Sequence, residues 1–481
     1  MSNLPENPHL DHLRRQARTL LRQFRAADVG ALALLREHHP RPHDPPRLAD
    51  AQLVVARSYG FPSWPALRRH VDAVARLTRS PHVVPPREDA ADELLRLGCV
   101  RYGGDSRADQ ARAAALLADR PELARASVYT AAATGDETAA RTFLADDPAA
   151  ADRTGGPFDW SPLLYLAYSR IGGVALPVAR LLLDHGADPD TGYLWEGTYP
   201  FTALTGVFGG GEDRGNQPPH SQGLALARML LEAGADPNDS QALYNRQFEP
   251  DDAHLRLLIE FGLGTDRDGP WHRLLRSSHG TPAQLLEDVL SYAARYDRPS
   301  WAQFALAAGA DPDGCGTRHP QFGGRTPLDN AVRQGSRPVA EMLRAAGASP
   351  VAADGVDEFV SLCLAGEREM VQKRRAADPG VVALARARRP DAVLAATELG
   401  RVAAVRLLVE LGFEVHAGHR LTPLHQAAYD GDAALVALLL ELGADPARRD
   451  LSFDATPLGW AEHNHQEATA ALLRPLTPAP R

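Results

Sequence analysis

Apolar residues recur along most of the chain at the three- and four-residue spacing that is typical of amphipathic helices. The stretch 433–442, AALVALLLEL, is almost wholly apolar, and the stretch before it begins with Thr422 and a proline. A threonine hydroxyl can cap free backbone N–H groups, and proline at the first helical position loses no hydrogen bond. Gly431 allows a tight turn, and Gly443 suits the left-handed C-terminal position. The pattern therefore predicts a pair of helices joined by a turn.

This pair recurs at a fixed spacing. From Thr422 to Gly443 is 21 residues, and from Thr326 to Gly347 is again 21. The glycine that closes a unit, in GAD, GAS or the related GFEV, stands at Gly186, Gly234, Gly309, Gly347, Gly412 and Gly443. One helix pair cannot bury its apolar stripe alone, so we expect successive pairs to stack into a solenoid.

The stretch 421–450, LTPLHQAAYDGDAALVALLLELGADPARRD, resembles an ankyrin repeat. The resemblance implies an all-α ankyrin-repeat solenoid over 90–481, with about eleven helix–turn–helix units, short hairpin-like connections and irregular units at 160–275. It also implies that His425 is the family's structural histidine, which bonds the backbone. The HNH at 463–465 then falls at an inter-helix turn, and we do not interpret it as a nuclease motif.

The first 80 residues follow a different pattern. Within 9–40, arginines lie largely off the apolar face, which consists of Leu13, Ala17, Leu20, Leu21 and Phe24. The segment resembles a helical leader that precedes ankyrin repeats in some bacterial proteins. This resemblance predicts a helical N-terminal cap over 1–80 and a linker over 81–89. A basic amphipathic helix can instead contact a lipid surface or an acidic partner, so this alternative stays open.

One unit breaks the register. From Thr202 to Gly234 is 32 residues, which is 11 more than in a regular unit, and we expect the extra residues at the inter-helix turn. They contain GGGEDRG, 209–215, which lacks the lysine of a phosphate-binding loop. Glu212 and Asp213 would also repel a phosphate, so we expect no nucleotide there. The stretch is either a site or a plain soluble loop.

The irregular units differ in their inner helices too. Regular units carry small pairs such as Ala427 and Ala428, whereas the odd units carry larger residues, among them Arg246, in the same positions. Arg246 should therefore loosen the stacking or face the groove. Aromatic residues, which often form binding hot spots, are also concentrated at 190–275. We hypothesise a recognition notch there, with the candidate binding residues Tyr193, Trp195, Tyr199, Phe208, Arg214, Tyr244, Asn245, Arg246, Trp271 and His272.

Two functions are compatible with this pattern. The first is a non-catalytic scaffold that recognises a protein partner with its concave surface, as the family resemblance implies. The alternative is a small-molecule-binding protein or a cofactor-independent enzyme with its site in the irregular repeats. Its candidate acid–base groups are Glu212, Asp213 and His220. The fold does not decide between the two, because function resides in the site.

Composition narrows the choice of partners. A net charge of -9 disfavours nucleic acid, since neutralising phosphates requires a basic face. The cysteines Cys99, Cys315 and Cys363 lie far apart without a CxxC pair, which predicts neither disulfides nor a zinc site. No stretch of 18 apolar residues is present, so we expect no transmembrane insertion. We expect a cytoplasmic protein without a metal or cofactor.

Overall fold

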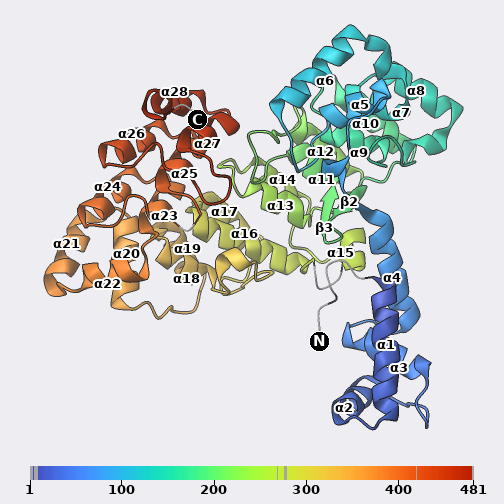
Figure 1. The fold of residues 1–481 in the computed structure, drawn as a ribbon, viewed down its shortest axis with the longest axis horizontal. Helices are drawn as coiled ribbons and strands as arrows, with labels where there is room; N and C mark the ends of the chain where they lie inside the picture. Colours follow the sequence, from blue (N-terminus) through green and yellow to red (C-terminus); the bar gives the residue numbers. More distant parts are fainter. Residues whose placement is uncertain (1–3, 5–8, 268, 276–278, 419, 479–481) are drawn as a thin grey trace. The chain divides into compact units, whose positions relative to one another are not determined.

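The computed structural model describes residues 4, 9–267, 269–275, 279–418 and 420–478. This part of the chain is mostly helical, from α1 to α28, with three short strands (Figure 1). It divides into two compact units. Unit 1 comprises Met1–Val207, His220–Ala235 and Asp268–His279, and unit 2 comprises Phe208–Pro219, Asp236–Arg267 and Gly280–Arg481.

Unit 1 begins with four helices that share one core. They are α1 (Leu10–Arg25), α2 (Val29–His38), α3 (Leu48–Ser58) and α4 (Trp64–Leu77). α3 packs against each of the other three. The apolar face predicted for α1 is buried at Leu13, Ala17, Leu20 and Phe24, where it meets Val54 and Val55 of α3. The role of this segment as a cap stays a prediction.

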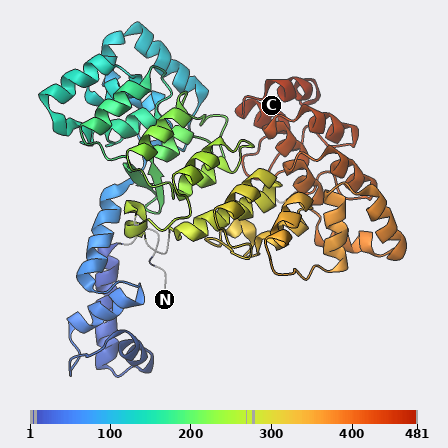
Figure 2. The same ribbon diagram turned by 180° about the vertical axis from the view of Figure 1, so that it is seen from behind.

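The rest of unit 1 is built largely from stacked helix pairs. The helices are α5 (Ala90–Gly98), α6 (Arg107–Asp119), α7 (Val128–Thr134), α8 (Glu137–Asp146), α9 (Pro162–Tyr168), α10 (Ala175–Asp184), α11 (Ala203–Phe208), α12 (Gly223–Glu232) and α15 (Pro270–Leu275). Short 3-10 helices lie at Pro81–Val83, Pro121–Arg125 and Pro148–Ala151. α7 packs between α5 and α9, and α10 packs between α8 and α12 (Figure 2). The pairs therefore form two parallel rows.

A small sheet in unit 1 is formed by β1 (Thr78–Arg79), β2 (Gly192–Trp195) and β3 (Tyr199–Thr202). β2 and β3 form an antiparallel hairpin, and β1 pairs parallel to β2, with Thr78 opposite Leu194. Glu196 and Gly197 at the hairpin turn have φ values of 52° and 77°. The sheet joins the end of α4 to one of the connections between helix pairs.

Unit 2 continues the same construction. Its helices are α13 (Ser240–Arg246), α14 (Ala253–Glu260), α16 (Pro282–Tyr296), α17 (Pro299–Ala307), α18 (Pro327–Arg333), α19 (Arg337–Ala345), α20 (Gly355–Leu364), α21 (Arg368–Ala377), α22 (Val381–Arg388), α23 (Ala392–Glu398), α24 (Val402–Glu410), α25 (Pro423–Asp430), α26 (Ala433–Glu441), α27 (Pro457–His463) and α28 (Glu467–Leu473), with 3-10 helices at Pro320–Phe322 and Arg474–Leu476. One row runs through α16, α18, α20, α23, α25 and α27, each in contact with the next. A second row includes α24, α26 and α28, so the predicted stacking of helix pairs is confirmed.

The local signals that predicted these helices operate as expected. The Thr326 and Thr456 hydroxyls accept the third backbone N–H of α18 and α27, and proline follows each threonine. Gly431 and Gly443 have φ values of 75° and 91°, which favour glycine. His425 bridges Thr422 and the Ala455 carbonyl, at 2.7 and 3.1 Å, which confirms the predicted bond to the backbone.

Candidate functional site

The residues inserted into the irregular unit lie between α11 and α12, as the register predicted, and residues 208–219 belong to unit 2. We call residues 208–219 the strap. Gly209, Gly210 and Gly211 have φ values of 59°, 83° and 101°, a region that side chains disfavour. The Gly210 N–H donates to the Gln217 carbonyl at 2.7 Å, and the Gly211 N–H donates to the Asn245 carbonyl at 2.9 Å. The glycines therefore fold the base of the strap onto α13.

The centre of the strap contacts the end of α25. The Arg214 guanidinium pairs with Asp430 at 2.6 Å and lies 4.6 Å from the centre of the Tyr429 ring. The Tyr429 hydroxyl donates to the backbone carbonyl of Glu212. On the other side, the Tyr244 hydroxyl of α13 donates to the Glu212 carboxylate at 2.7 Å. These contacts join residues more than two hundred positions apart in the chain.

Asp213 and Asn216 of the strap contact the last residue of α27 and the turn that follows it. Asp213 pairs with His463 at 2.9 Å, and the hydrogen bond together with the Asp213 charge raises the pKa of His463 despite partial burial. The Asn216 amide donates to the His463 carbonyl at 3.3 Å, and its oxygen lies 2.8 Å from Nε2 of His465. The glycine-rich stretch is thus a fixed contact between repeats, and it is not slack.

The base of the strap is buried. Phe208, Asn245 and Arg246 are only 3%, 2% and 8% exposed. Arg246 forms an ion pair with Asp251 and donates to the Phe208 carbonyl at 3.5 Å. Arg246 was expected to loosen the stacking or to face the groove, and it lies buried beneath the strap because the ion pair compensates its charge. These three residues therefore form the buried base of the strap.

The other five candidate binding residues belong to unit 1, and two of them are buried in it. Tyr193 is 1% exposed and lies between the rings of Trp160 and Phe201, at 5.2 and 5.6 Å. Trp271 is also buried, and its indole N–H donates to the Asp190 carbonyl at 3.0 Å. Trp195, Tyr199 and His272 are half-buried or exposed. Tyr199, at 47%, stands out on the β2–β3 hairpin.

The candidate acid–base groups fall in different units. His220 belongs to unit 1, where burial lowers its pKa to about 4 and its Nδ1 accepts the Gln222 N–H at 3.0 Å. Glu212 and Asp213 belong to unit 2 and hold Tyr244 and His463. Each group thus has its own partner within its unit. The acid–base role of the three stays a hypothesis.

A second feature of unit 2 is the connection between α26 and α27, residues 444–456, which we call the finger. Its centre is Asp450, which accepts backbone N–H groups of Ser452 and Phe453 at 2.6 and 2.7 Å. The Asp450 carboxylate also accepts the Ala455 N–H and the Trp460 indole N–H, both at 2.9 Å. Burial alone would raise the pKa of Asp450, but these donors outweigh it and lower the pKa to about 2. The carboxylate therefore fixes the finger in one conformation.

The fixed finger carries two exposed apolar side chains. Leu451 is 83% exposed and Phe453 is 74% exposed. The Phe453 ring leans against Trp460 at 5.8 Å, and the Leu451 N–H donates to the Arg420 carbonyl of the preceding connection at 2.9 Å. Large apolar side chains so exposed on an ordered loop are typical of a contact surface.

Comparison with known proteins identifies these repeats. Residues 392–477, which include α23 to α28, match the family model for ankyrin repeats in three copies. This part of the chain therefore consists of ankyrin repeats. A similar solved structure is the crystal structure of the human ASB11 ankyrin repeat domain, at 23% sequence identity and a TM-score of 0.22. That match covers 50% of this chain and 98% of the other.

The sequence did not indicate all residues of these surfaces. The strap partners Tyr429 and His463 and the finger residues Leu451 and Phe453 all lie within the matched ankyrin repeats. For the finger a signal existed, since RRDLSFDAT places two large apolar residues in a connection that is otherwise polar. For the contacts of the strap with α25 and α27 no local signal existed, because these partners follow the strap by more than two hundred residues.

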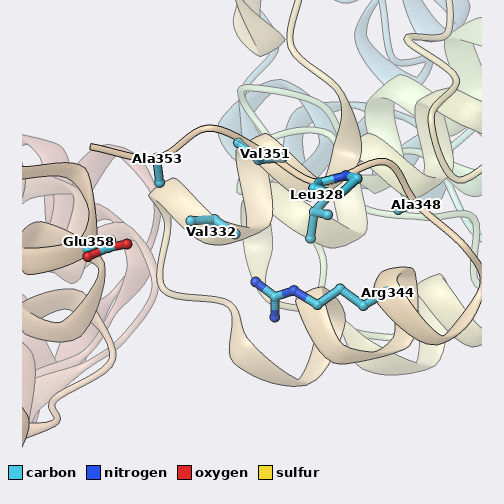
Figure 3. Close-up of a pocket in the computed structure, with 8 residues that line it drawn as sticks. Leu328, Val332, Arg344, Ala348, Val351, Ala353 and Glu358 are labelled. Atoms are coloured by element: carbon cyan, nitrogen blue, oxygen red, sulfur yellow. The ribbon is translucent and has the colours of Figure 1, made fainter. Parts of the chain in front are cut away.

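The protein also has a shallow cavity of about 320 Å³ in unit 2, lined by α18, α19 and the segment before α20 (Figure 3). Its wall is apolar at Leu328, Val332 and Val351. Arg344 and Glu358 project at its edges, but both are exposed to solvent. Because water already solvates both charges, this cavity offers no strong polar anchor, and we assign it no ligand.

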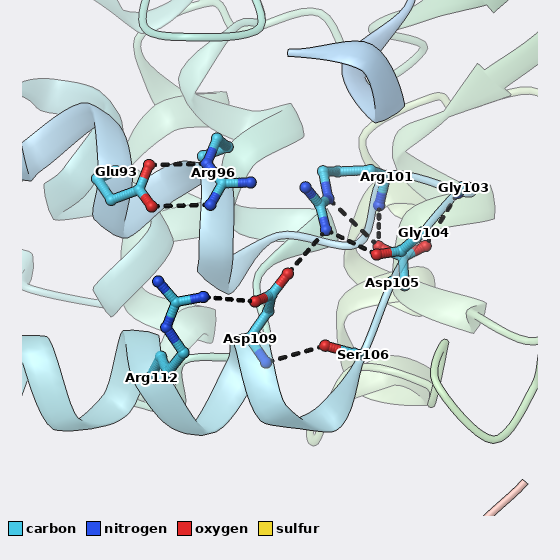
Figure 4. A network of polar contacts seen from close by, with 9 residues as sticks. All are labelled: Glu93, Arg96, Arg101, Gly103, Gly104, Asp105, Ser106, Asp109 and Arg112. Carbon is cyan, nitrogen blue, oxygen red and sulfur yellow. Dashed lines mark hydrogen bonds and ion pairs between the residues drawn. The ribbon is translucent and has the colours of Figure 1, made fainter. Parts of the chain in front are cut away.

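A polar network in unit 1 has a structural role (Figure 4). Arg96 forms two bonds of 2.7 Å with Glu93 on α5. Arg101 bonds Asp109 at 3.1 Å, and the Arg101 N–H donates to Asp105 at 2.8 Å. The network links the end of α5 to the start of α6, and it leaves the arginines occupied by carboxylates.

Among the described helices, none combines the length and the apolar character that crossing a membrane requires. Within the residues that the structure describes, no three His, Cys, Asp or Glu side chains converge into a group that could hold a metal ion. The strap contact and the finger are therefore the features that we consider for function.

Proposed function

We propose that this protein is a non-catalytic scaffold that binds a protein partner through the finger of its ankyrin repeats. Ankyrin repeats generally serve as protein–protein interaction modules. The observation that carries the proposal is the exposure of Leu451 and Phe453 on a loop that Asp450 holds in place. A fixed loop loses little conformational entropy on binding. More of the free energy gained by burying its side chains therefore contributes to the affinity.

The size of the expected gain follows from the two side chains. Fully burying a leucine or phenylalanine side chain contributes about 1.5–3 kcal/mol each. Aromatic anchors surrounded by weaker contacts are typical of binding hot spots. The pair can therefore anchor a partner if the surrounding surface excludes water.

The charges around the finger indicate the kind of partner. Arg448 precedes Asp450 on the exposed side, Arg449 pairs with Asp454 of the same finger at 3.3 Å, and Arg420 donates to the Ser452 hydroxyl at 3.0 Å. An apolar tip flanked by arginines fits a protein surface with an apolar depression and carboxylates at its rim. Such a complex should weaken at high salt, since rim charges are screened.

The notch over 190–275 stays a second proposed contact region. Tyr199 and Trp195 of the β2–β3 hairpin are its accessible aromatic residues in unit 1. Replacing Arg246 would not test the notch cleanly, because the side chain is buried in an ion pair and its loss would disturb folding. A Tyr199→Ala variant avoids this difficulty.

The experiment compares partners retained by wild-type protein and by the double variant Leu451→Ser, Phe453→Ser. Affinity purification from the native host, with quantification of each retained protein, should show one or more partners that the double variant loses. Val174→Ser is the matched control, because Val174 is an apolar residue 61% exposed in unit 1. A partner set identical for wild type and the double variant would contradict the role of the finger.

A further inference from the structure

We propose that the strap is a proton-dependent latch: protonated His463 holds Asp213 and keeps residues 208–219 docked on α25 and α27, and loss of the proton loosens them. The latch involves residues other than the finger, so it is independent of the partner-binding proposal. It concerns how the chain covers part of its own ankyrin repeats.

Polar and charged contacts hold the strap on the ends of α25 and α27. Its docked face consists of Glu212, Asp213, Arg214 and Asn216, each of which has a partner on α25, on α27 or in the turn after α27. The side chains beneath it are polar or aromatic, so docking buries little aliphatic surface. Directional contacts, and not a large apolar core, therefore hold the strap.

Most of these contacts do not depend on pH near neutrality. The Arg214–Asp430 pair joins a guanidinium to a carboxylate, and the Tyr429 hydroxyl donates to the Glu212 backbone carbonyl, so neither contact contains an imidazole. His463 differs, because imidazole changes its charge near neutral pH. Among the described contacts of the strap, the Asp213–His463 pair joins a carboxylate directly to an imidazole. His319 also lies within reach of the Glu212 charge, but burial lowers its pKa.

The surroundings of His463 favour Asp213 as its partner. Glu462, its neighbour on α27, is engaged with Arg474 at 2.9 Å, and Asp430 of α25 is engaged with Arg214. Asp213 is the group whose hydrogen bond and charge act on His463. The other charged or titratable side chains of the neighbouring elements are Glu462 and His465, which lie close to His463 in the chain, Arg474, which pairs with Glu462, and Tyr429, Asp430 and Arg214 at the end of α25. His465 shares Asn216 with His463.

The direction of the pH dependence of strap docking follows from the direction in which the pKa of His463 is shifted. The bond with Asp213 and its charge raise the pKa of His463 in the docked state above its ordinary value of 6.5. Protonated His463 therefore contributes its full stabilisation of strap docking when the pH is below 6.5, the ordinary pKa. This stabilisation is lost as the pH rises through the pKa that His463 has in the docked state. Because the His463 side chain is 59% exposed, solvent screens the pair. We expect a change in docking of about two- to five-fold.

The test is hydrogen exchange of strap amides in the full-length protein and in the His463→Gln variant, at about pH 6 and about pH 8.5. This substitution leaves the strap sequence unchanged, so intrinsic exchange rates cancel in the ratio of the two proteins at each pH. The latch predicts that the variant exchanges about two- to five-fold faster at the lower pH. At the higher pH the ratio should approach one.

Two further variants distinguish the pH-dependent latch from a loss of strap contacts that does not depend on pH. Arg214→Gln should speed strap exchange at both pH values, because its contacts with Asp430 and Tyr429 contain no imidazole. His12→Gln replaces an exposed histidine of unit 1 and should change nothing. A ratio for His463→Gln that is the same at both pH values would overturn the latch, as would a ratio of one at the lower pH.

Discussion

The guanidinium of Arg214 lies 4.6 Å from the centre of the Tyr429 ring and forms an ion pair with Asp430 at 2.6 Å. Arg214 is 18% exposed, so both interactions operate partly out of water and are stronger than at an open surface. One side chain thereby fastens the strap to two neighbouring residues at the end of α25. The insertion consequently adds contacts between segments more than two hundred positions apart to a solenoid built mainly from contacts between neighbouring repeats.

Gly215 allows the strap to approach α27 closely. A Cβ at this position would lie 2.0 Å from Oδ1 of Asn464, whose amide is already held by the Tyr429 carbonyl at 2.6 Å. Gly215→Ala should therefore weaken strap docking by about 1–3 kcal/mol, because a buried neighbour has to move. Hydrogen exchange of strap amides in the variant measures the loss.

Gly459→Ala is the control for this substitution. Gly459 lies in α27, and a Cβ there would have no atom nearer than 3.6 Å. Alanine is favoured over glycine in a helix interior by about 0.5–1 kcal/mol, so this variant should be as stable as wild type or more stable. Undisturbed strap exchange in Gly215→Ala would show that the strap is not seated against Asn464.

Asp450 is predicted to control the order of the finger. Asparagine would direct an amide group toward backbone donors, so Asp450→Asn should destabilise the finger by about 1.5–3 kcal/mol. Exchange of the amides of Ser452, Phe453 and Ala455, which donate to the carboxylate, should accelerate. The control is Asp454→Asn, since Asp454 is an exposed neighbour in the same connection.

The Asp450 carboxylate should also make the order of the finger depend on pH. Its pKa of about 2 lies below the ordinary 3.8, so its contribution is present above about pH 4 and is lost as pH falls toward 2. Finger exchange in wild type, corrected for intrinsic rates, should therefore rise in that window. Asp450→Asn should show no such rise, and a rise of equal size in the variant would contradict the assignment.

The parts of the fold that the sequence predicted depend on local chemistry. Thr326 and Thr456 cap helices, and Gly443 ends one, because capping and left-handed turns need only a few neighbouring residues. The repeat spacing then placed the insertion between α11 and α12 correctly. His425 was assigned its backbone bond by resemblance to the ankyrin family, and the Ala455 carbonyl confirms it.

The candidate site was harder to predict for two physical reasons. Asp213 and His463 are 250 positions apart, and no local pattern signals that their elements meet. Aromatic residues are also ambiguous, because Tyr and Trp are suited both to a binding surface and to a core. Tyr193 shows the ambiguity, since its position in an aromatic cluster became evident only once Trp160 and Phe201 were placed around it.

Tyr193 supplies a prediction that separates these two roles. Its hydroxyl is buried and has no hydrogen-bond partner among the described residues. Removing an unsatisfied buried hydroxyl is neutral or favourable, so Tyr193→Phe should leave stability unchanged or raise it by up to about 1 kcal/mol. Tyr168→Phe in the same cluster should instead cost about 1 kcal/mol, because its hydroxyl donates to the Thr202 carbonyl at 3.0 Å.

Denaturant unfolding of both variants measures the contrast between the two tyrosines. A loss of stability in Tyr193→Phe as large as that in Tyr168→Phe would mean that the Tyr193 hydroxyl has a partner such as a bound water molecule. Loss of a binding partner with unchanged stability would restore Tyr193 to the notch. The pair of substitutions is matched, since both remove one oxygen from a buried ring of the same cluster.

Asp288 on α16 provides a pH dependence opposite in sign to that of Asp450. Burial raises its pKa to about 7, although the Thr317 N–H and hydroxyl, at 3.0 and 2.8 Å, oppose the shift. The folded protein therefore holds this proton more tightly than the unfolded chain between about pH 4 and 7. Over that window Asp288 makes stability fall as pH rises, by at most about 1.4 kcal/mol per pH unit.

Asp288→Asn should remove this slope, because an amide does not titrate and can still accept the Thr317 N–H. Denaturant midpoints from about pH 4 to 8 would give the difference between wild type and variant, which should grow toward neutral pH and level off above about 7. Asp146→Asn, on the exposed end of α8, is the control and should give a constant difference. A constant difference for Asp288→Asn as well would show that the carboxyl is ionised throughout, with the two Thr317 bonds outweighing the effect of burial.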